Sequence, residues 1–263
     1  MKHAGIKVVV AGAGGKMGQA LIEAVRADTS LVLAAALDVR GSPAIGANIG
    51  GLKVGSDIRK ALAAGDVLID FTRPEGTIEH LEVCARLGKA IVIGTTGFSD
   101  PLKKAILRAG RKIPIAMSPN FAVGVNAVFK LAKVAAEILG DDFDVEIIEA
   151  HHRNKVDAPS GSALKLGEII ASALKRDLKK DAKHGREGDT GVRPVKQIGF
   201  HAIRGGDIVG EHTVIFAGPG ERVEITIRSQ SRMTYALGAL RAVKFLRGRR
   251  AGLYDMSDIL GLK

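Results

Sequence analysis

Short apolar runs rich in Val and Ile recur through the first half of the chain, at residues 7–12, 31–38, 67–71, 90–94 and 113–117. A continuous apolar run of this length is typical of a strand that is buried on both faces. Between the runs lie helix-like stretches: Met17–Ala27, Asp57–Ala64, Glu75–Leu87 and Asp100–Arg111. The alternation predicts a Rossmann-like, doubly wound α/β domain over residues 1–122, with a parallel sheet and right-handed crossovers.

After Asn120 the pattern changes to longer helices and clustered strands. The predicted elements are a helix at Val125–Leu139, a strand at Asp144–Ala150, a helix at Ser162–Leu174, a polar stretch through Pro194, and strands at 196–204, 207–217 and 222–229. Arg-Gly-Gly-Asp and Gly-Pro-Gly-Glu mark turns between the last three strands. We therefore predict a second, α+β domain over residues 123–231, containing a mixed sheet.

A last helix is predicted at Tyr235–Arg247, with cations in its final turn and Gly248 as its stop. The hydrophobic pattern alone assigns this helix to neither domain.

The composition, 46% hydrophobic and 25% charged residues in a chain of 263, is that of a globular protein and excludes a disordered or fibrous one. A single cysteine, Cys84, excludes an intramolecular disulfide and a cysteine-rich zinc site. We expect Cys84 to be a small buried hydrophobe and not a nucleophile, which counts against a thiohemiacetal aldehyde dehydrogenase. With no long apolar run and no signal-like amino end, we expect a cytoplasmic protein.

Charge raises the question of a nucleic-acid partner, because 39 Lys and Arg against 28 Asp and Glu give a net charge of +11. The basic residues are dense only at Lys175–Arg186 and Arg247–Arg250, and elsewhere acids lie between them. Aromatic residues for base stacking make up only 4% of the chain. We therefore expect a solvated surface that attracts small anions, and neither a nucleic-acid nor a membrane partner.

A glycine-rich turn, Gly12-Ala13-Gly14-Gly15-Lys16-Met17-Gly18, connects the first strand to the first helix. Its spacing is GxxGxxG and not GxGxxG, but Asp38 follows Gly18 by 20 residues, at the end of the second strand. This context predicts that the turn binds a pyrophosphate and that Asp38 binds the ribose hydroxyls. The alternative is a tight turn that binds no phosphate. Asp38 favours NADH, whereas Lys16 and Arg40 would neutralise the extra phosphate of NADPH, so both cofactors stay open.

Two further loops, Gly94-Thr95-Thr96-Gly97 and Ser118-Pro119-Asn120-Phe121, follow the fourth and fifth strands. Both lie at the carboxyl ends of parallel strands, where open α/β sheets bind their ligands. Each loop taken alone is equally well explained as turn-forming residues. Asp70-Phe71-Thr72, after the third strand, is a weaker candidate of the same kind.

The densest group of chemical side chains lies in the segment Glu149–Ser162. Its potential cations are His151, His152, Arg153 and Lys155. Asp157 follows them, and then comes a helix whose predicted N-cap is Ser160. The segment predicts an anion site.

In that site the backbone N–H groups of Gly161 and Ser162 would hold one carboxylate at the helix N-terminus. The imidazoles and Lys155 would hold another or donate a proton. Because neighbouring residues of a strand point to opposite faces, His151 and His152 share a site only where the strand has ended. The alternative is two ordinary histidines and a capped helix.

The remaining histidines indicate no further site. His184, His201 and His212 lack a metal-ligand spacing, no HExxH or GxSxG motif is present, and we expect no metal. His3 and His80 are predicted to be surface residues.

The segment EAHHRNKVDAPSGSAL resembles the dihydrodipicolinate reductase family. The resemblance is nearly full length, since GAGGKMG, DFTRPEGT, GTTG, NFAVGVN, EAHHRNKVDAPSG, RGGDIVGEH and SRMTYA occur in the family's order. It implies a nicotinamide-dependent reduction of 4-hydroxy-tetrahydrodipicolinate, or of the dihydro compound formed from it by loss of water, to tetrahydrodipicolinate in lysine and diaminopimelate biosynthesis. In the family, hydride adds to an α,β-unsaturated imine and a proton is delivered to the neighbouring ring carbon.

Carried onto this chain, the resemblance implies roles for the candidate residues. His151 becomes the general acid and base, Lys155 a second proton donor or a cation that binds substrate, and His152, Gly161 and Ser162 substrate binders. The cofactor is placed on Gly12–Met17, Asp38, Gly94–Thr96 and Ser118–Phe121. The resemblance also implies a homotetramer joined through the sheets of the second domain, and a C-terminal segment, 232–263, that packs back on the first domain.

The chain departs from the family's pattern at two places. Ser162 replaces a Thr of well-known members and keeps the hydroxyl, and Val39-Arg40 replaces an Arg that directly follows the ribose-binding acid in some members. Two competing hypotheses are a nicotinamide-binding redox sensor that holds nucleic acid on its basic surface, and another dehydrogenase for small dicarboxylates or aldehydes.

Overall fold

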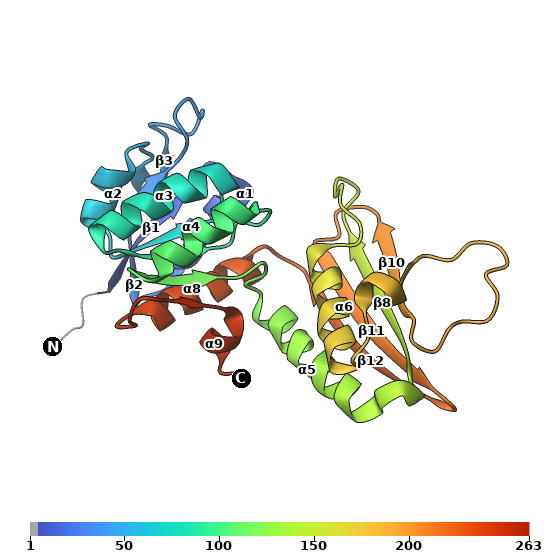
Figure 1. The fold of residues 1–263 in the computed structure, drawn as a ribbon. Helices are drawn as coiled ribbons and strands as arrows, with labels where there is room; N and C mark the ends of the chain where they lie inside the picture. The colour runs from blue at the N-terminus through green and yellow to red at the C-terminus, as the bar shows by residue number, and fades with distance from the viewer. Residues whose placement is uncertain (1–4, 263) are drawn as a thin grey trace. The chain divides into compact units, whose positions relative to one another are not determined.

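The structure is a computed structural model that describes residues 5–262, so His3 lies outside the described part of the chain. The described residues fall into two compact units (Figure 1). The first contains the residues up to Val123 together with those from Arg232 onward, and the second is Gly124–Ser231. The predicted fold class is confirmed, because the first unit is built on a parallel sheet with helices and the second on a mixed sheet.

Every strand pair in the sheet of the first unit is parallel. The six strands are β1 (Ile6–Ala11), β2 (Leu31–Leu37), β5 (Val67–Asp70), β6 (Ala90–Ile93), β7 (Pro114–Met117) and β13 (Gly252–Tyr254). Their order is β13-β7-β6-β5-β1-β2, so the chain first adds β2 on one side of β1 and then β5 on the other. The carboxyl end of β1 is therefore the switch point at which such sheets bind ligands.

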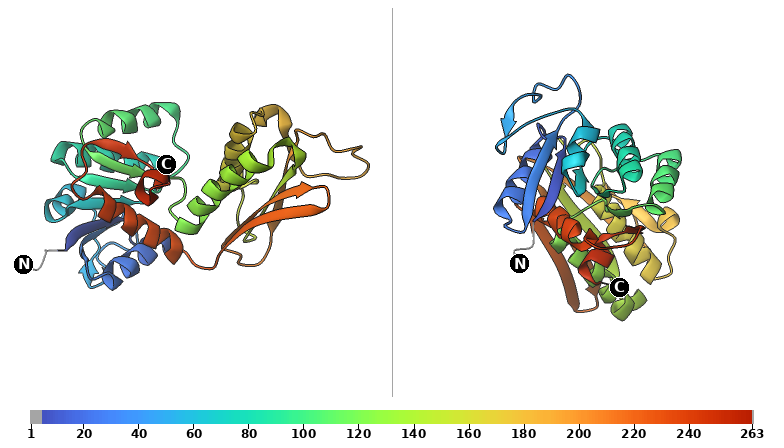
Figure 2. Two further views of the ribbon diagram at one scale, coloured as in Figure 1. Left: turned by 90° about the horizontal axis from the view of Figure 1, so that it is seen from below. Right: turned by 90° about the vertical axis from the view of Figure 1, so that its left-hand side faces the viewer.

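Helices cover both faces of this sheet (Figure 2). One face is covered by α1 (Lys16–Ala27), α8 (Met233–Leu246) and α9 (Met256–Leu260), and the other by α2 (Ile58–Ala64), α3 (Pro74–Leu87) and α4 (Asp100–Gly110). In β1, Val8 and Val10 pack into the core beneath α1, α8 and α9, whereas Val9 and Ala11 pack into the core on the other face of the sheet. Side chains alternate in this way along any strand.

Helix α8 packs beside α1, although most of the chain separates them in sequence. A Cβ on Gly238 would lie 1.7 Å from the carbonyl oxygen of Phe121, so glycine is required where α8 passes that backbone. The C-terminal segment continues into β13, which pairs with β7 at the edge of the sheet.

The second unit contains a five-stranded sheet of order β12-β11-β8-β10-β9. Its strands are β8 (Asp144–His151), β9 (Ala182–His184), β10 (Ile198–Arg204), β11 (Gly210–Gly218) and β12 (Glu221–Ser229). β8 is parallel to β10 and antiparallel to β11, so the Arg-Gly-Gly-Asp turn joins strands on opposite sides of β8 and forms no hairpin. Helices α5 (Val123–Leu139) and α6 (Gly161–Ala173) bury apolar residues against one face of the sheet.

Several short elements were not predicted from the hydrophobic pattern. They are β3 (Asn48–Ile49), β4 (Leu52–Lys53), the 3₁₀ turn Gly140–Asp142, α7 (Leu178–Asp181), β9, β13 and α9. Each has five residues or fewer, which is too short for a helical or strand period to be recognised. Within residues 5–262, no helix is both long and apolar enough to cross a membrane.

Candidate active site

The glycine turn after β1 has the backbone geometry of a phosphate site. Gly12 has φ +73°, a conformation that favours glycine. A Cβ on Gly18 would lie 2.0 Å from the carbonyl oxygen of Gly12, so the helix packs directly against the turn. Helix α1 begins at Lys16, and its N-cap, Gly15, has no side chain that could cap the first N–H groups. The N–H groups of the first turn, with the helix dipole, suit an anion.

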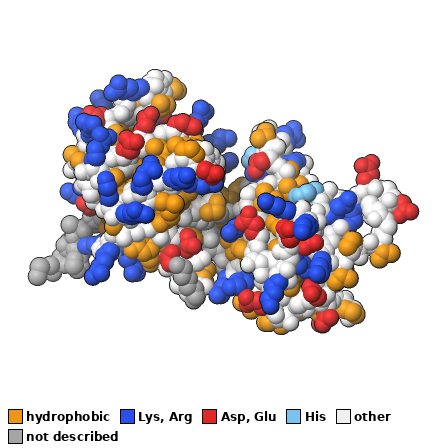
Figure 3. Space-filling model, in the orientation of Figure 1, with side chains coloured by type: hydrophobic (Ala, Val, Ile, Leu, Met, Phe, Trp, Pro, Cys, Tyr) orange, Lys and Arg blue, Asp and Glu red, His pale blue; other side chains and the backbone are white. Residues whose placement is uncertain are grey.

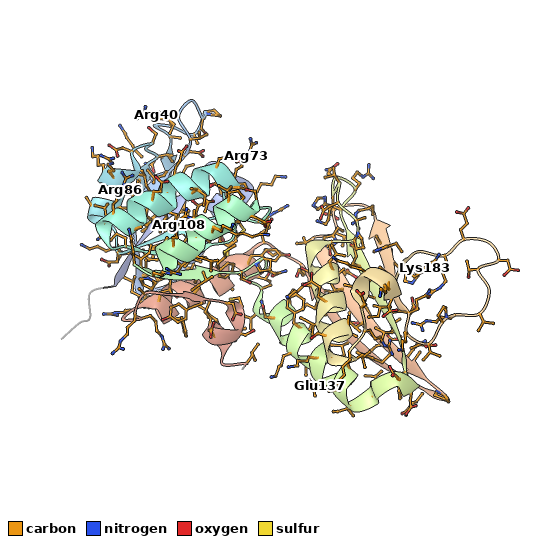
Figure 4. The ribbon with its side chains drawn as sticks, in the orientation of Figure 1. Arg40, Arg73, Arg86, Arg108, Glu137 and Lys183 are labelled. Atoms are coloured by element: carbon orange, nitrogen blue, oxygen red, sulfur yellow. The ribbon has the colours of Figure 1, made fainter. Side chains whose placement is uncertain are left out.

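Asp38 lies against this turn, at the end of β2. Its Oδ2 accepts a hydrogen bond from the Gly14 N–H at 2.8 Å, and its Oδ1 accepts one from the Val39 N–H at 2.8 Å. A Cβ on Gly14 would lie 2.9 Å from Asp38 Oδ2, so any side chain there would press on the carboxylate. Arg40 is exposed on the loop that follows β2 (Figure 4).

The loops after β5, β6 and β7 meet the glycine turn at the same edge of the sheet. A Cβ on Gly12 would lie 3.1 Å from Thr72 Cγ2, and one on Gly94 would lie 2.1 Å from the Phe71 ring. The rings of Phe71 and Phe121 have centroids 5.5 Å apart. The structure thus brings the predicted cofactor loops together.

Within these loops the candidate residues differ in accessibility. Gly14, Gly15, Lys16, Thr96 and Pro119 are exposed, Gly12, Met17, Gly94 and Asn120 are partly buried, and Ala13, Thr95, Ser118 and Phe121 are buried. The buried residues shape the edge of the sheet. Ser118 Oγ, for example, donates to the Asn120 carbonyl oxygen at 2.8 Å, which closes its loop.

Asp70 supports these loops from inside the unit. Its buried carboxylate accepts hydrogen bonds from Thr72 and Thr77, and the Thr77 hydroxyl lies 2.8 Å from that of Thr95. Asp70 Oδ2 also lies 2.7 Å from His80 Nδ1. Burial raises the pKa of Asp70, but the hydrogen bonds from His80 and Thr72 outweigh it and lower that pKa. His80, predicted as a surface residue, has a side chain only 22% exposed, because it closes this network.

The second cluster begins where β8 ends, at His151, and His152 is the first residue beyond the strand. His151 Nδ1 lies 2.6 Å from Glu149 Oε2. Burial lowers the pKa of His151, Glu149 opposes that effect, and the balance remains below the ordinary value. His151 is therefore a weakly basic imidazole in a largely buried position.

Lys155 lies beyond the strand with its ammonium on Asp157, at 2.8 and 2.9 Å from the two carboxylate oxygens. The hydrogen bond from Lys155 lowers the pKa of Asp157. The Asp157 side chain is 57% exposed and that of Lys155 21%. Because the acid is solvated, an incoming carboxylate can replace it on Lys155 at small cost.

Helix α6 begins directly after this segment, and Ser160 is its N-cap as predicted: its Oγ accepts from the Ala163 N–H at 3.2 Å. A Cβ on Gly161 would meet no atom within 4 Å. The first turn of α6 thus presents N–H groups and open space beside Gly161. Gly161 and Ser162 are the first two residues of α6, and the carboxylate site at their N–H groups stays a prediction.

Three residues of this cluster were not recognised as functional from the sequence: Glu149, Arg204 and His212. Arg204 donates to both Glu149 oxygens, at 2.7 and 2.8 Å. His212 Nε2 lies 2.9 Å from Ser160 Oγ, and its ring centroid is 5.2 Å from that of His151. Glu149 lies two residues before His151 on β8, so strand alternation places both on one face and could have indicated their contact. No local spacing signals the contacts of Arg204 and His212, because they depend on the alignment of β10 and β11 with β8.

His212 makes the stability of the protein sensitive to acid. Burial, followed by the neighbouring positive charge of His151, lowers the pKa of His212 to about 4 from 6.5. As pH falls through 6.5 the unfolded chain binds a proton that the folded one refuses, so stability is lost until folded His212 protonates near pH 4. Between pH 6.5 and 4 we expect the free energy of unfolding of His212→Gln to fall by about 3 kcal/mol less than that of wild type. Urea unfolding at each pH measures this difference.

The control for this experiment is His184→Gln, at an exposed position on β9. That variant should keep the acid sensitivity of the wild type. Parallel stability curves for wild type and His212→Gln would contradict the prediction.

Two other expectations can be compared with the structure. Cys84 is buried in α3, and burial raises the pKa of its thiol to about 12, so the thiol is unreactive as predicted. The second expectation was a solvated surface on which acids lie among the basic residues. On the visible face of each unit, Lys and Arg side chains are interspersed with Asp and Glu (Figure 3).

A glycine turn at the switch point of a parallel sheet, with an acid at the end of the second strand, is typical of the dinucleotide-binding domain of nicotinamide-dependent oxidoreductases. Two family models match the chain: "Dihydrodipicolinate reductase, N-terminus" over residues 6–121 and "Dihydrodipicolinate reductase, C-terminus" over residues 124–260. The chain belongs to the dihydrodipicolinate reductase family.

Similar proteins agree with this assignment. A 4-hydroxy-tetrahydrodipicolinate reductase of Aromatoleum aromaticum is 57% identical, over 98% of this chain and 96% of the relative. One of Dechloromonas aromatica is 55% identical, over 98% of each chain. A solved structure of dipicolinate-bound dihydrodipicolinate reductase from Paenisporosarcina sp. TG-14 has a TM-score of 0.77 and 27% identity, over 97% of this chain and 98% of that one.

Proposed function

We propose that this chain is a 4-hydroxy-tetrahydrodipicolinate reductase that uses NADH or NADPH to form tetrahydrodipicolinate, by way of dihydrodipicolinate, in lysine and diaminopimelate biosynthesis. Relatives of that name match nearly its whole length. The observation that carries the proposal is the cluster of His151, Lys155 and the N-terminus of α6, where there is space beside Gly161, in one unit. A dicarboxylate suits such a cluster, and the similar solved enzyme is described as bound to dipicolinate.

The substrate carboxylates have two matching sets of donors. The backbone of Gly161 and Ser162 at the start of α6 would hold one carboxylate, aided by the helix dipole. His152 and Lys155 would hold the other carboxylate. Lys155 would give up its ion pair with Asp157 to bind it. These residues bind and orient the ring.

The cofactor fits the first unit. Gly12–Met17 would hold the pyrophosphate and Asp38 the ribose, with Gly94–Thr96 and Ser118–Phe121 beside the nicotinamide end. When bound, the dihydronicotinamide supplies a hydride to the unsaturated imine. The glycine turn supports this assignment. A side chain at Gly14 would meet Asp38, and one at Gly18 would meet the backbone of Gly12.

His151 would supply the proton that the ring carbon takes up after hydride addition. Its lowered pKa favours release of that proton near neutral pH. Lys155 lies four residues further on and acts either as a second proton donor or as the cation that binds substrate. The first role would change turnover and the second mainly the Michaelis constant.

Asp38 is expected to set the balance between the two cofactors, because its carboxylate repels the additional phosphate of NADPH. We expect Asp38→Asn to raise the ratio of kcat/KM for NADPH to that for NADH about tenfold, the factor that corresponds to about 1.4 kcal/mol of repulsion. Initial rates with each cofactor measure this ratio. Asp100→Asn, at an exposed position of α4, serves as the control. An unchanged ratio in Asp38→Asn would remove Asp38 from cofactor selection.

The test of the proposed function is loss of dihydronicotinamide absorbance when the protein meets substrate made in place from pyruvate and aspartate semialdehyde by the preceding synthase. Oxidation should require both the synthase and this protein. Parallel assays with NADH and NADPH rank the cofactors. If protein that binds cofactor oxidises neither, the proposed reaction is wrong, and a redox sensor or another dicarboxylate dehydrogenase takes its place.

We also infer a division of labour, with residues 1–122 and 232–263 binding cofactor and 123–231 binding substrate and joining protomers into a homotetramer. The face of the second sheet away from α5 and α6 supports the last point, because Ile203 on it is 52% exposed and Ile148 and Ile215 on it are only partly buried. A monomeric mass in solution, measured by light scattering, would contradict it.

A further inference from the structure

Glu149 is a buried carboxylate whose two oxygens are both fully engaged. Its residue is 1% exposed. Oε1 accepts from the Ser160 N–H at 3.0 Å and from Arg204 Nη2 at 2.7 Å, while Oε2 accepts from Arg204 Nη1 at 2.8 Å and lies 2.6 Å from His151 Nδ1. Burial raises the pKa of Glu149, but Arg204, His151 and the Ser160 N–H outweigh it and lower that pKa. Glu149 is therefore ionised, and an ionised carboxylate accepts hydrogen bonds only.

This contact defines the protonation of His151. Because Glu149 is an acceptor, Nδ1 of His151 carries the hydrogen between them. The other ring nitrogen, Nε2, is then the one that gains and loses a proton in catalysis. A carboxylate on the far nitrogen also stabilises the charged imidazolium before it donates.

Arg204 holds the pair in place from the neighbouring strand. It lies opposite His151 in the register of β10 and β8. The same guanidinium donates to the carbonyl oxygen of Asp157 at 2.7 Å, so it also ties down the segment that carries Lys155. The two-pronged contact with Glu149 fixes the carboxylate plane, which a single hydrogen bond would leave free to rotate.

We propose that Glu149, clamped by Arg204, is the positioning residue of His151: it holds Nδ1–H and leaves Nε2 to exchange the proton with substrate. The inference rests on the proposed function, in which His151 is the general acid. Glu149 touches no reacting atom and acts only through the imidazole. The charged and titratable groups that face His151 are Glu149, Lys155, Arg204 and His212.

The test is Glu149→Gln, which keeps the shape of the side chain and removes its charge. We expect kcat to fall about 10- to 100-fold with little change in KM or in NADH affinity. Glu149 raises the pKa of His151, so its loss makes protonated His151 scarcer. The limb of the pH profile on which activity falls with rising pH should therefore move about one unit toward acid.

Glu146→Gln is the matched control. Glu146 lies three residues earlier on β8 and is held in the same way by Arg186, Arg193 and His201, but its position in the strand directs it to the opposite face. This variant should keep the wild-type pH profile. A wild-type kcat and pH profile in Glu149→Gln, or an equal shift in Glu146→Gln, would overturn the inference.

Glu149→Asp keeps the negative charge and shortens the side chain, so it distinguishes the effect of the charge from that of the hydrogen bond to His151. It also replaces Glu149→Gln as the test if circular dichroism shows that Glu149→Gln is unfolded. The shorter acid keeps the negative charge but no longer reaches Nδ1, so kcat should fall about tenfold and the pH limb should move toward acid by less than in Glu149→Gln. Wild-type kcat in Glu149→Asp would contradict a positioning role.

His151→Gln distinguishes the failure of this inference from that of the proposed function. If His151→Gln keeps wild-type turnover, His151 is not the general acid and both proposals fail. If it loses turnover while Glu149→Gln does not, only the positioning role fails. The double variant should be no slower than His151→Gln alone, because Glu149 acts through the imidazole; a further loss would indicate a merely structural role.

Discussion

His151→Gln should lower kcat about 10²- to 10⁴-fold, the usual contribution of a positioned general acid. Gln has no titratable group, so no proton reaches the ring carbon from this position after hydride addition. KM should change much less, because proton donation is made mainly in the transition state. Steady-state rates with substrate generated by the synthase, at saturating dihydronicotinamide, give both constants.

The matched control is His201→Gln. His201 is also a histidine beside a carboxylate, 2.7 Å from Glu146 Oε2, but it lies one strand away on β10. This change should leave kcat within about twofold of wild type, as is usual for a substitution away from the chemistry. Wild-type turnover in His151→Gln would exclude His151 from the reaction.

Lys155→Ala should abolish detectable turnover and leave NADH affinity nearly intact. The substitution removes the ammonium that holds a substrate carboxylate or donates the second proton, and it leaves Asp157 as an uncompensated negative charge beside the site. A dicarboxylate is then repelled where it was attracted. Turnover is measured in the same coupled assay and NADH binding by fluorescence titration.

Lys165→Ala is the control for loss of one positive charge in this unit. Lys165 lies on α6 with a side chain 48% exposed and pairs with Glu168 at the surface. Its removal should leave turnover unchanged. If Lys155→Ala keeps both the kcat and the KM of wild type, the cationic cluster does not act as the substrate site. A redox sensor, in contrast, would have no turnover to lose in either variant.

The parallel sheet could be predicted from sequence because its central strands are buried on both faces and read as uninterrupted apolar runs. Val8, Val9 and Val10, for example, are all fully buried. Strands β9 and β13 lack this signal because they lie at sheet edges and are three residues long. Strands β9 and β13 form because their backbones pair with β10 and β7, and a hydrophobic pattern does not indicate such pairing.

The candidate site was predictable where its residues are close in sequence. His151, Lys155 and Ser160 fall within ten consecutive residues, from the end of β8 to the N-cap of α6, and helix capping at Ser160 follows from local rules. Arg204 and His212 were missed because each is more than 50 residues from its partner, Glu149 and Ser160 respectively. The alternation along one strand decides which face a residue lies on, but it does not specify which residue of a distant strand lies beside it.

The return of α8 to the first unit has a consequence for the order in which the protein is made. Ala236, Ala239, Leu240 and Val243 of α8 fill the core beside α1, so part of one face of the parallel sheet stays uncovered until the ribosome has synthesised the residues from Arg232 onward. The second unit, Gly124–Ser231, is continuous in the chain and is complete before that point. During translation the second unit can therefore close its core first, and the first unit, although begun earlier, finishes last.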